Sequence, residues 1–128
     1  MEPTNLRYHK EHEWIRVEGK QAVLGISDFA QDALGDIVFI EMPKVGATVT
    51  AGQQIGEIES TKTTSSLYTP VSGKIIKVNT DLKDHPEMIN SDPYGKGLIA
   101  EVELSDPAQV DSLMTAEQYE TFLKSQKK

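Results

Sequence analysis

The sequence contains no cysteine among its 128 residues. A chain without cysteine can form no disulfide, offers no thiolate nucleophile and has no thiolate ligand for a metal ion. Any thiol chemistry that the protein takes part in must therefore use sulfur supplied by another molecule.

Basic residues are also few, with 13 Lys and Arg against 20 Asp and Glu, which gives a net charge of −7. This balance argues against a nucleic-acid partner, because such affinity depends largely on basic side chains. No apolar run approaches the roughly 20 residues of a membrane span. The first residues, Met1–Asn5, resemble neither a signal peptide nor a transit peptide. We therefore expect a soluble, cytoplasmic protein that does not bind membranes.

The composition, 38% hydrophobic and 26% charged, predicts one globular domain over residues 1–128. Short β-branched and apolar stretches, separated by turn residues, predict a mainly β barrel or sandwich. A first hairpin is expected to turn at Glu18–Lys20. The predicted strands are 12–17, 21–26, 36–41, 48–50, 54–59, 74–79 and 98–104.

Helices are expected at two places. Asp28 is placed to cap a short helix after the second predicted strand, with Gln31 completing a capping pair and Gly35 ending it. A helical segment is predicted over about 106–125, where Asp106 precedes a proline and Thr115 begins a capping box. The segment 81–97, rich in Asp, Pro, Asn and Gly, is interpreted as an irregular surface loop.

The stretch of greatest interest runs from Gly52 to Ile75, with Lys62 at its centre. Lys62 is flanked from Ser60 to Ser66 by Ser and Thr alone, which crowd little and can bond their own backbone in a turn. A lysine hairpin is thus predicted over about 53–78. Lys62 is either an ordinary solvated lysine or an attachment point, since acylation would turn its stem into a long flexible arm. The spacing alone leaves both interpretations open.

The segment Glu59-Ser60-Thr61-Lys62-Thr63, followed by Tyr68-Thr69-Pro70-Val71-Ser72-Gly73, resembles the lipoylation signature of lipoyl-carrier proteins. The resemblance is greatest to the H-proteins of the glycine cleavage system and extends over nearly the whole chain. Further matching segments are Lys10-Glu11-His12-Glu13-Trp14, Gly25–Gln31, Leu34–Phe39, Ile89–Tyr94 and Ala116–Glu120.

The resemblance implies a barrel-sandwich hybrid fold with small helices, and a carrier with no catalytic residues that bears covalent lipoate on Lys62. Its implied partners are glycine decarboxylase, the aminomethyltransferase, dihydrolipoyl dehydrogenase and a lipoate ligase or lipoyl/octanoyl transferase. In such a cycle the carrier moves the aminomethyl group of glycine from the decarboxylase to the aminomethyltransferase. A carrier that visits several enzymes is expected to be a monomer.

Two residues are candidates for contact with the arm or its cargo. The loaded arm carries a cationic amine, which needs a carboxylate partner if it is shielded from water. The resemblance assigns this task to Glu13, for which the alternative is a solvated charge on the outer face of a strand. Trp14 is expected on the opposite face, in the core or a cleft wall. Ser66 stands where the family often has a second acid, and Leu98 where many members have an aromatic residue.

Other candidate residues are interpreted as structural. His9 and His12 are expected on opposite faces of an extended segment without a third ligand, so no metal site is predicted. His85 has no evident nucleophile partner, and Gly95-Lys96-Gly97 lacks the pattern of a nucleotide loop. Glu57 and Glu59 are expected on a solvated strand face.

Three functions remain to be distinguished. The leading hypothesis is a lipoylated shuttle for the aminomethyl group. The second keeps the lipoyl arm on Lys62 but assigns it to a relay that donates lipoyl groups to 2-oxoacid dehydrogenase subunits. The third is an unmodified β-domain that serves as an interaction module.

Overall fold

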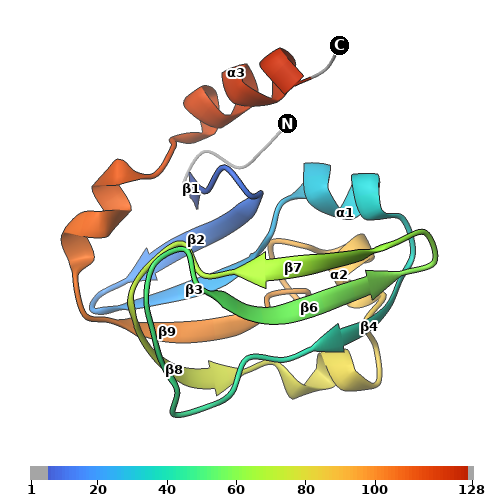
Figure 1. Cartoon of the computed structure of the whole chain (residues 1–128), viewed down its shortest axis with the longest axis horizontal. Coiled ribbons are helices and arrows are strands. Elements are labelled where there is room, and N and C mark those ends of the chain that lie inside the picture. Colours follow the sequence, from blue (N-terminus) through green and yellow to red (C-terminus); the bar gives the residue numbers. More distant parts are fainter. Residues whose placement is uncertain (1–5, 127–128) are drawn as a thin grey trace.

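Two antiparallel β-sheets form the body of the protein in the computed structural model, which describes residues 6–126 (Figure 1). The six-stranded sheet has the order β1-β2-β3-β9-β8-β5, and the three-stranded sheet has the order β4-β6-β7. The strands are β1 (Arg7–Tyr8), β2 (Glu13–Glu18), β3 (Gln21–Ile26), β4 (Ile37–Glu41), β5 (Thr48–Val49), β6 (Gln54–Ser60), β7 (Thr64–Tyr68), β8 (Gly73–Val78) and β9 (Ala100–Leu104).

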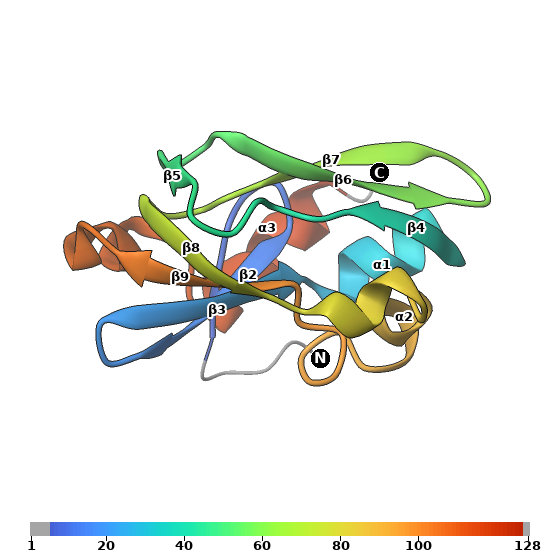
Figure 2. The same ribbon diagram turned by 90° about the horizontal axis from the view of Figure 1, so that it is seen from below.

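Short helices connect and flank the sheets. The α-helices are α1 (Asp28–Leu34), α2 (Met88–Ser91) and α3 (Ala116–Gln126), and the 3₁₀ helices are η1 (Thr80–Lys83) and η2 (Pro107–Ser112). Figure 2 shows the two sheets as layers, with α1 and α2 at the same end of the molecule as the β6–β7 turn. The predicted mainly β fold with small helices is therefore confirmed.

The main hydrophobic core lies between the two sheets, because each sheet turns its alternate apolar side chains inward. In β6, Ile58 is buried while its neighbours Glu57 and Glu59 are exposed, as predicted for a solvated strand face. Ile40 of β4 and Ile75 of β8 join the same core. β6 thus turns an apolar side toward the core and an acidic side toward solvent.

A second, smaller core holds α3 against β1. The rings of Tyr8 and Tyr119 stack with centroids 4.5 Å apart and planes 3° from parallel. The predicted capping box at the start of α3 is confirmed, because Thr115 N–H donates to Gln118 Oε1 at 2.9 Å and Gln118 N–H donates to Thr115 Oγ1 at 3.2 Å. Aromatic stacking and a satisfied helix start fix α3 across the N-terminal strand.

Several sequence-based expectations need correction. The short strand β1 was not predicted, and segment 81–97 is not wholly irregular, because it contains most of η1 and all of α2. The cap of α1 is Ser27, whose Oγ accepts from Ala30 N–H, and Asp28 is the first helical residue. Asp106 makes no side-chain capping bond to η2. The ends of the predicted domain, 1–5 and 127–128, lie outside the described residues, as do the Met1–Asn5 residues examined for a targeting signal.

The helices of the described chain are short and polar. Within residues 6–126, none has the length and apolar character that crossing a bilayer would require.

Candidate functional site

The lysine lies on a tight turn between β6 and β7. The two strands pair up to Glu59 and Thr64, and Ser60 N–H donates to Thr63 O at 2.8 Å. The Ser60 side chain closes the turn from inside, since its Oγ accepts from Lys62 N–H at 3.2 Å and from Thr63 N–H at 3.1 Å. A serine that bonds its own turn in this way leaves the lysine side chain with no structural task.

The hairpin is therefore shorter than the predicted range 53–78. β7 was missed because its sequence, Thr-Ser-Ser-Leu-Tyr, buries only Leu67 fully and reads as polar. Thr has a good strand propensity despite its hydroxyl, which is the signal that would have identified β7. β8, expected as the partner strand, lies in the other sheet.

The Lys62 side chain is exposed, and no ion pair to it is found among residues 6–126. It lies across Gly35 at the end of α1, where a Cβ on Gly35 would sit 3.2 Å from Lys62 Cε and 3.7 Å from Nζ. Gly35 ends α1 with a φ of +82°, a conformation that favours glycine. The ammonium is thus open to solvent and leans toward α1.

An asparagine on α2 holds the backbone beneath this turn. Asn90 Nδ2 donates to Gly35 O at 2.8 Å, and Asn90 Oδ1 accepts from Ile37 N–H at 2.9 Å. Asp36 lies between Gly35 and Ile37, and its backbone carbonyl oxygen accepts from Thr61 N–H at 3.0 Å. No local sequence pattern predicts this role of Asn90, because its bonds span more than 50 positions of the chain.

Glu13 is buried, with 1% of its surface exposed, so the interpretation as a solvated charge is wrong. Its Oε2 accepts from Tyr68 N–H at 3.0 Å, and its Oε1 lies 3.2 Å from His9 Nδ1. Burial raises the pKa of the Glu13 carboxyl, and the bonds from His9 and Tyr68 oppose this effect. A cation that binds next to the Glu13 carboxyl would therefore oppose the effect of burial and favour the ionised form.

Trp14 lies in the second core, as the alternation along β2 predicts. It is fully buried and its Nε1–H donates to Pro93 O at 3.1 Å. Gly25 lies opposite it in the register, and a Cβ there would come within 2.9 Å of the indole ring. The ring therefore packs directly on the β3 backbone and fixes the start of β2, where Glu13 is positioned.

A pocket of about 210 Å³ brings together Glu13 and Ser66, the two predicted contact residues. We call it the α1 pocket; its walls are Glu11, His12, Glu13, Ile26, Phe29, Ala30, Ala33, Leu34, Ile58, Ser65 and Ser66. Ser66 is half-buried on β7, opposite Glu57. Lys62 is not a wall residue, but its side chain crosses Gly35, the residue after Leu34. The lysine thus stands beside an apolar pocket that holds one buried carboxyl.

His12 is an additional wall residue that sequence analysis did not assign to the site. It adopts a φ of +76°, which is uncommon for a residue with a side chain, so His9 and His12 do not lie on an extended strand as predicted. His12 Nδ1 lies 2.8 Å from Tyr119 Oη, which is 2.7 Å from Ser27 Oγ. Burial lowers the pKa of His12. His12 thus links α3 to the start of α1.

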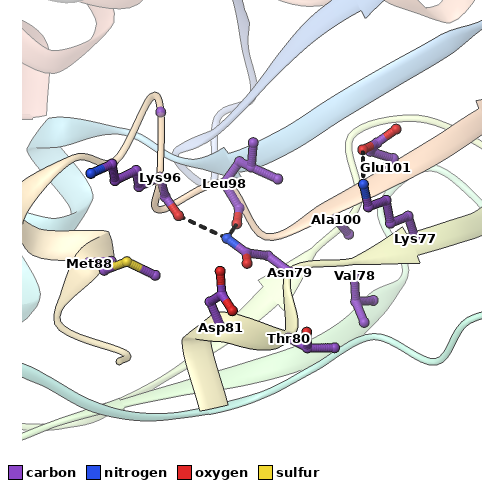
Figure 3. Close-up of a pocket in the computed structure, with 11 residues that line it drawn as sticks. Lys77, Val78, Asn79, Thr80, Asp81, Met88, Lys96, Leu98, Ala100 and Glu101 are labelled. Atoms are coloured by element: carbon purple, nitrogen blue, oxygen red, sulfur yellow. Dashed lines mark hydrogen bonds and ion pairs between the residues drawn. The ribbon is translucent and has the colours of Figure 1, made fainter. Parts of the chain in front are cut away.

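Two larger surface pockets contain none of Lys62, Glu13 and Ser66. The β1 pocket, about 750 Å³, includes Tyr8, His9, Lys10 and Tyr68 among its walls. The β8 pocket, about 620 Å³, lies beside η1 and α2, and Figure 3 shows Asn79 bonded there to the carbonyls of Lys96 and Leu98. Leu98, which departs from the family pattern, lies in this pocket. No cluster suited to a metal ion occurs within residues 6–126.

The two sheets, with a lysine displayed on a hairpin turn beside a small pocket, define a carrier of the lipoyl type with a barrel-sandwich hybrid fold. A sequence model described as Glycine cleavage H-protein matches residues 6–126. The chain belongs to this family. It is therefore a carrier of the aminomethyl group in the glycine cleavage system rather than a catalyst.

Individual relatives agree with this assignment. The chain is 54% identical over 123 residues to a protein named glycine cleavage system H protein from Myxococcus xanthus, covering 96% of this chain and 95% of the relative. It is 55% identical over 117 residues to one from Bacillus cereus, covering 91% and 92%. A crystal structure of a glycine cleavage system H protein from Mycobacterium marinum superposes with a TM-score of 0.88 at 41% identity, covering 95% of this chain and 98% of that one.

Proposed function

We propose that Lys62 is the covalent lipoyl attachment site through which this carrier transports the aminomethyl group. The observation that carries the proposal is the geometry of the turn: Ser60 satisfies the backbone, and the Lys62 amine is exposed without an ion pair among residues 6–126. A modifying enzyme can therefore approach the amine without unfolding any element. Small neighbouring side chains, Thr61 and Thr63, leave that approach open.

The residues around the turn fit a lipoyl arm. The chain has no sulfur nucleophile of its own, and lipoate supplies a dithiol when it is bound. Lys62 would hold the group by an amide bond, which removes the lysine charge. The apolar walls of the α1 pocket, which α1 supplies through Phe29, Ala30, Ala33 and Leu34, suit an aliphatic chain and exclude water from it.

Glu13 is the proposed anchor for the cargo amine. A primary ammonium that enters the α1 pocket loses water and needs a charged partner, and Glu13 is the buried carboxyl in the pocket wall. Ser66, across the same pocket, offers a hydroxyl that can accept an N–H. These two side chains would hold the amine, while the apolar walls keep water from the labile carbon–sulfur group.

The wider expectations follow from the same assignment. The proposed partners are glycine decarboxylase, the aminomethyltransferase, dihydrolipoyl dehydrogenase and a lipoate ligase or lipoyl/octanoyl transferase. The carrier would work in the cytoplasm as a monomer of one domain. The acidic face of β6, with Glu57 and Glu59, would attract enzymes with basic surfaces, an effect that salt weakens.

Attachment is tested by intact mass after expression in lipoate-replete cells. Wild-type chain should gain the mass of one lipoyl group, and Lys62→Arg should gain none. Lys77→Arg is the matched control, because Lys77 is 73% exposed on β8 and should not affect modification. An unshifted wild-type mass, or a modified Lys62→Arg chain, would refute the assignment.

The cargo anchor is tested by the lifetime of the loaded carrier. Glu13→Gln should remain lipoylated but lose the aminomethyl group about tenfold faster, since a hydrogen bond between two charges is replaced by one to a neutral amide. Glu11→Gln, also in the pocket wall but exposed, is the control. Equal lifetimes of wild type and Glu13→Gln would remove Glu13 from this role.

A further inference from the structure

His9 meets Glu13 through a ring nitrogen that has two neighbours. Nδ1 of His9 lies 3.2 Å from Glu13 Oε1 and 3.2 Å from Glu11 N. A backbone N–H can only donate, so Nδ1 must be unprotonated when it accepts from Glu11. In that state the contact with Glu13 Oε1 is a hydrogen bond only if the Glu13 carboxyl carries the proton.

The alternative arrangement reverses these roles. When Nδ1 carries a proton it donates to an ionised Glu13, and the Glu11 N–H loses its acceptor. One ring nitrogen therefore has two exclusive states, and each corresponds to one protonation state of Glu13. Tyr68 N–H donates to the other carboxyl oxygen, Oε2, which can accept that bond in either state.

His9 and Glu13 also connect two separate pockets. Glu13 lies in the wall of the α1 pocket, whereas His9 and Tyr68 lie in the wall of the β1 pocket. The His9 side chain is 17% exposed and that of Glu13 is 1% exposed. A proton on the buried carboxyl can therefore reach water through the His9 ring without passing through the α1 pocket, where the cargo would lie.

We propose that His9 is a positioning residue for the cargo amine, which prepares the Glu13 carboxylate by exchanging a proton and a hydrogen bond with it when the amine docks. This inference rests on the proposed function of Lys62 and Glu13, and it adds a proton-coupled step to cargo binding. It gives a role to His9, to which the sequence pattern assigned none.

The protons balance in the following way. The exchange starts from the state in which Glu13 carries the proton and donates it to His9 Nδ1, while the ring proton of His9 is on Nε2. When the ammonium docks, the Glu13 proton moves to Nδ1, and the Nε2 proton leaves to water. The product is an ammonium–carboxylate pair beside a neutral His9 that donates from Nδ1, with one proton released. No bond other than these N–H and O–H bonds forms or breaks.

The other titratable groups near the pair are few. Glu11 and His12, from the same loop, lie in the α1 pocket wall, and Tyr8, Lys10 and Tyr68 lie on the β1 pocket side. The wall residues from α1, β3 and β6 are apolar, and those from β7 are the serines 65 and 66 and Tyr68. His9 is therefore the titratable side chain that contacts the Glu13 carboxyl in the part of the chain that the structure describes.

The first test uses the unmodified full chain, so that it does not depend on lipoylation. NMR would follow the Glu13 carboxyl carbon and the His9 ring nitrogens across pH in wild type, His9→Asn and His85→Asn. Asparagine can keep the bond to Glu11 N–H through its Oδ1 but cannot exchange a ring proton. His85 forms a matched pair with Glu87, also at 3.2 Å, but with both side chains more than 60% exposed.

In wild type we expect the Glu13 carbon and the His9 tautomer to change together with pH. In His9→Asn the Glu13 transition should move to higher pH, because the variant loses the Nδ1–H donor that favours the ionised carboxyl in the second of the two states. His85→Asn should leave it unchanged. An unmoved Glu13 transition in His9→Asn, or a single His9 tautomer throughout, would overturn the inference.

The second test uses the lipoylated chain loaded with the aminomethyl group. Loading should shift the His9 ring to the Nδ1–H tautomer, and His9→Asn should lose cargo about threefold faster, with the difference growing as pH falls. A pH-independent difference, or an unshifted ring, would overturn the inference. If the chain were never lipoylated, the proposed function of Lys62 would fail, while the first test would still decide whether His9 and Glu13 exchange a proton.

Discussion

The Lys62 turn and the Glu13 site lie in the same part of the molecule but solve opposite problems. At the turn, every stabilising bond described above belongs to the backbone, Ser60 or Asn90, and the lysine side chain is left free. At the Glu13 site the functional side chain itself is buried and makes the bonds. One group is kept accessible to a modifying enzyme, and the other is withheld from water.

The exposure of Lys62 and the burial of Glu13 differ in their effect on stability, and only the buried carboxyl is expected to lower it. An exposed amine without a partner changes the free energy of unfolding little, whereas a buried carboxyl must lose water in the folded state. The hydrogen bonds of Glu13 to His9 and Tyr68 offset part of that penalty. The buried Glu13 carboxyl, which is in place before the cargo amine binds, is therefore expected to lower the free energy of unfolding at neutral pH.

The largest expected effect would come from removing the brace beneath the turn. Asn90→Ala deletes the bonds to Gly35 O and Ile37 N–H, so that both backbone groups lose this partner, and also the bond to Gln31 Oε1. We expect the free energy of unfolding in urea to fall by about 2–3 kcal/mol. Ser91→Ala, which removes only a long bond to Met88 O, is the control. A decrease in the free energy of unfolding of less than about 0.5 kcal/mol would mean that the turn is stable without the Asn90 hydrogen bonds.

A smaller effect of opposite sign is expected from Glu13→Gln in the unmodified chain. The pKa of Glu13 is raised above its ordinary 4.5, so the stability that its protonated form contributes is present at lower pH and is lost as pH rises through the raised pKa. Glutamine can donate to His9 Nδ1 and accept from Tyr68 N–H without a charge. At pH 7 the variant should be more stable by about 1 kcal/mol.

The measurement is urea unfolding from pH 4 to pH 8. Wild type should lose stability relative to Glu13→Gln as pH rises across this range, and Glu11→Gln should follow wild type because Glu11 is exposed. Parallel curves for wild type and Glu13→Gln would show that the carboxyl is as well solvated in the fold as outside it, and the contrast between the two sites would disappear.

The sequence predicts the accessible half of this site better than the buried half. Lys62 and its Ser and Thr neighbours are contiguous, and the turn depends on bonds within three residues, so local chemistry suffices. The β2–β3 hairpin and the α3 capping box are local in the same sense. Glu13 was predicted through resemblance, and its burial was left open, because that depends on elements outside its own strand, among them β7, whose Tyr68 lies 55 positions away.

The contacts that sequence analysis missed share this long range. His12 reaches Tyr119 across 107 positions, and Asn90 reaches Ile37 across 53. The left-handed backbone of His12, at φ +76°, leaves no pattern in the sequence, because residues other than glycine adopt it only occasionally. The packing of the two sheets, rather than the pattern within any one strand, determines which polar residues are buried.

The smallest expected effect concerns Lys62 itself. If the turn is held entirely by Ser60, Asp36 and the β6–β7 pairs, then Lys62→Gln in the unmodified chain should change the free energy of unfolding by less than about 0.5 kcal/mol. Lys77→Gln, which loses a long contact with Glu101, provides the scale for an exposed lysine. A loss of more than about 1 kcal/mol would show that the amine stabilises the turn. Acylation would then have to break that contact, and the lysine would no longer be free for its proposed task.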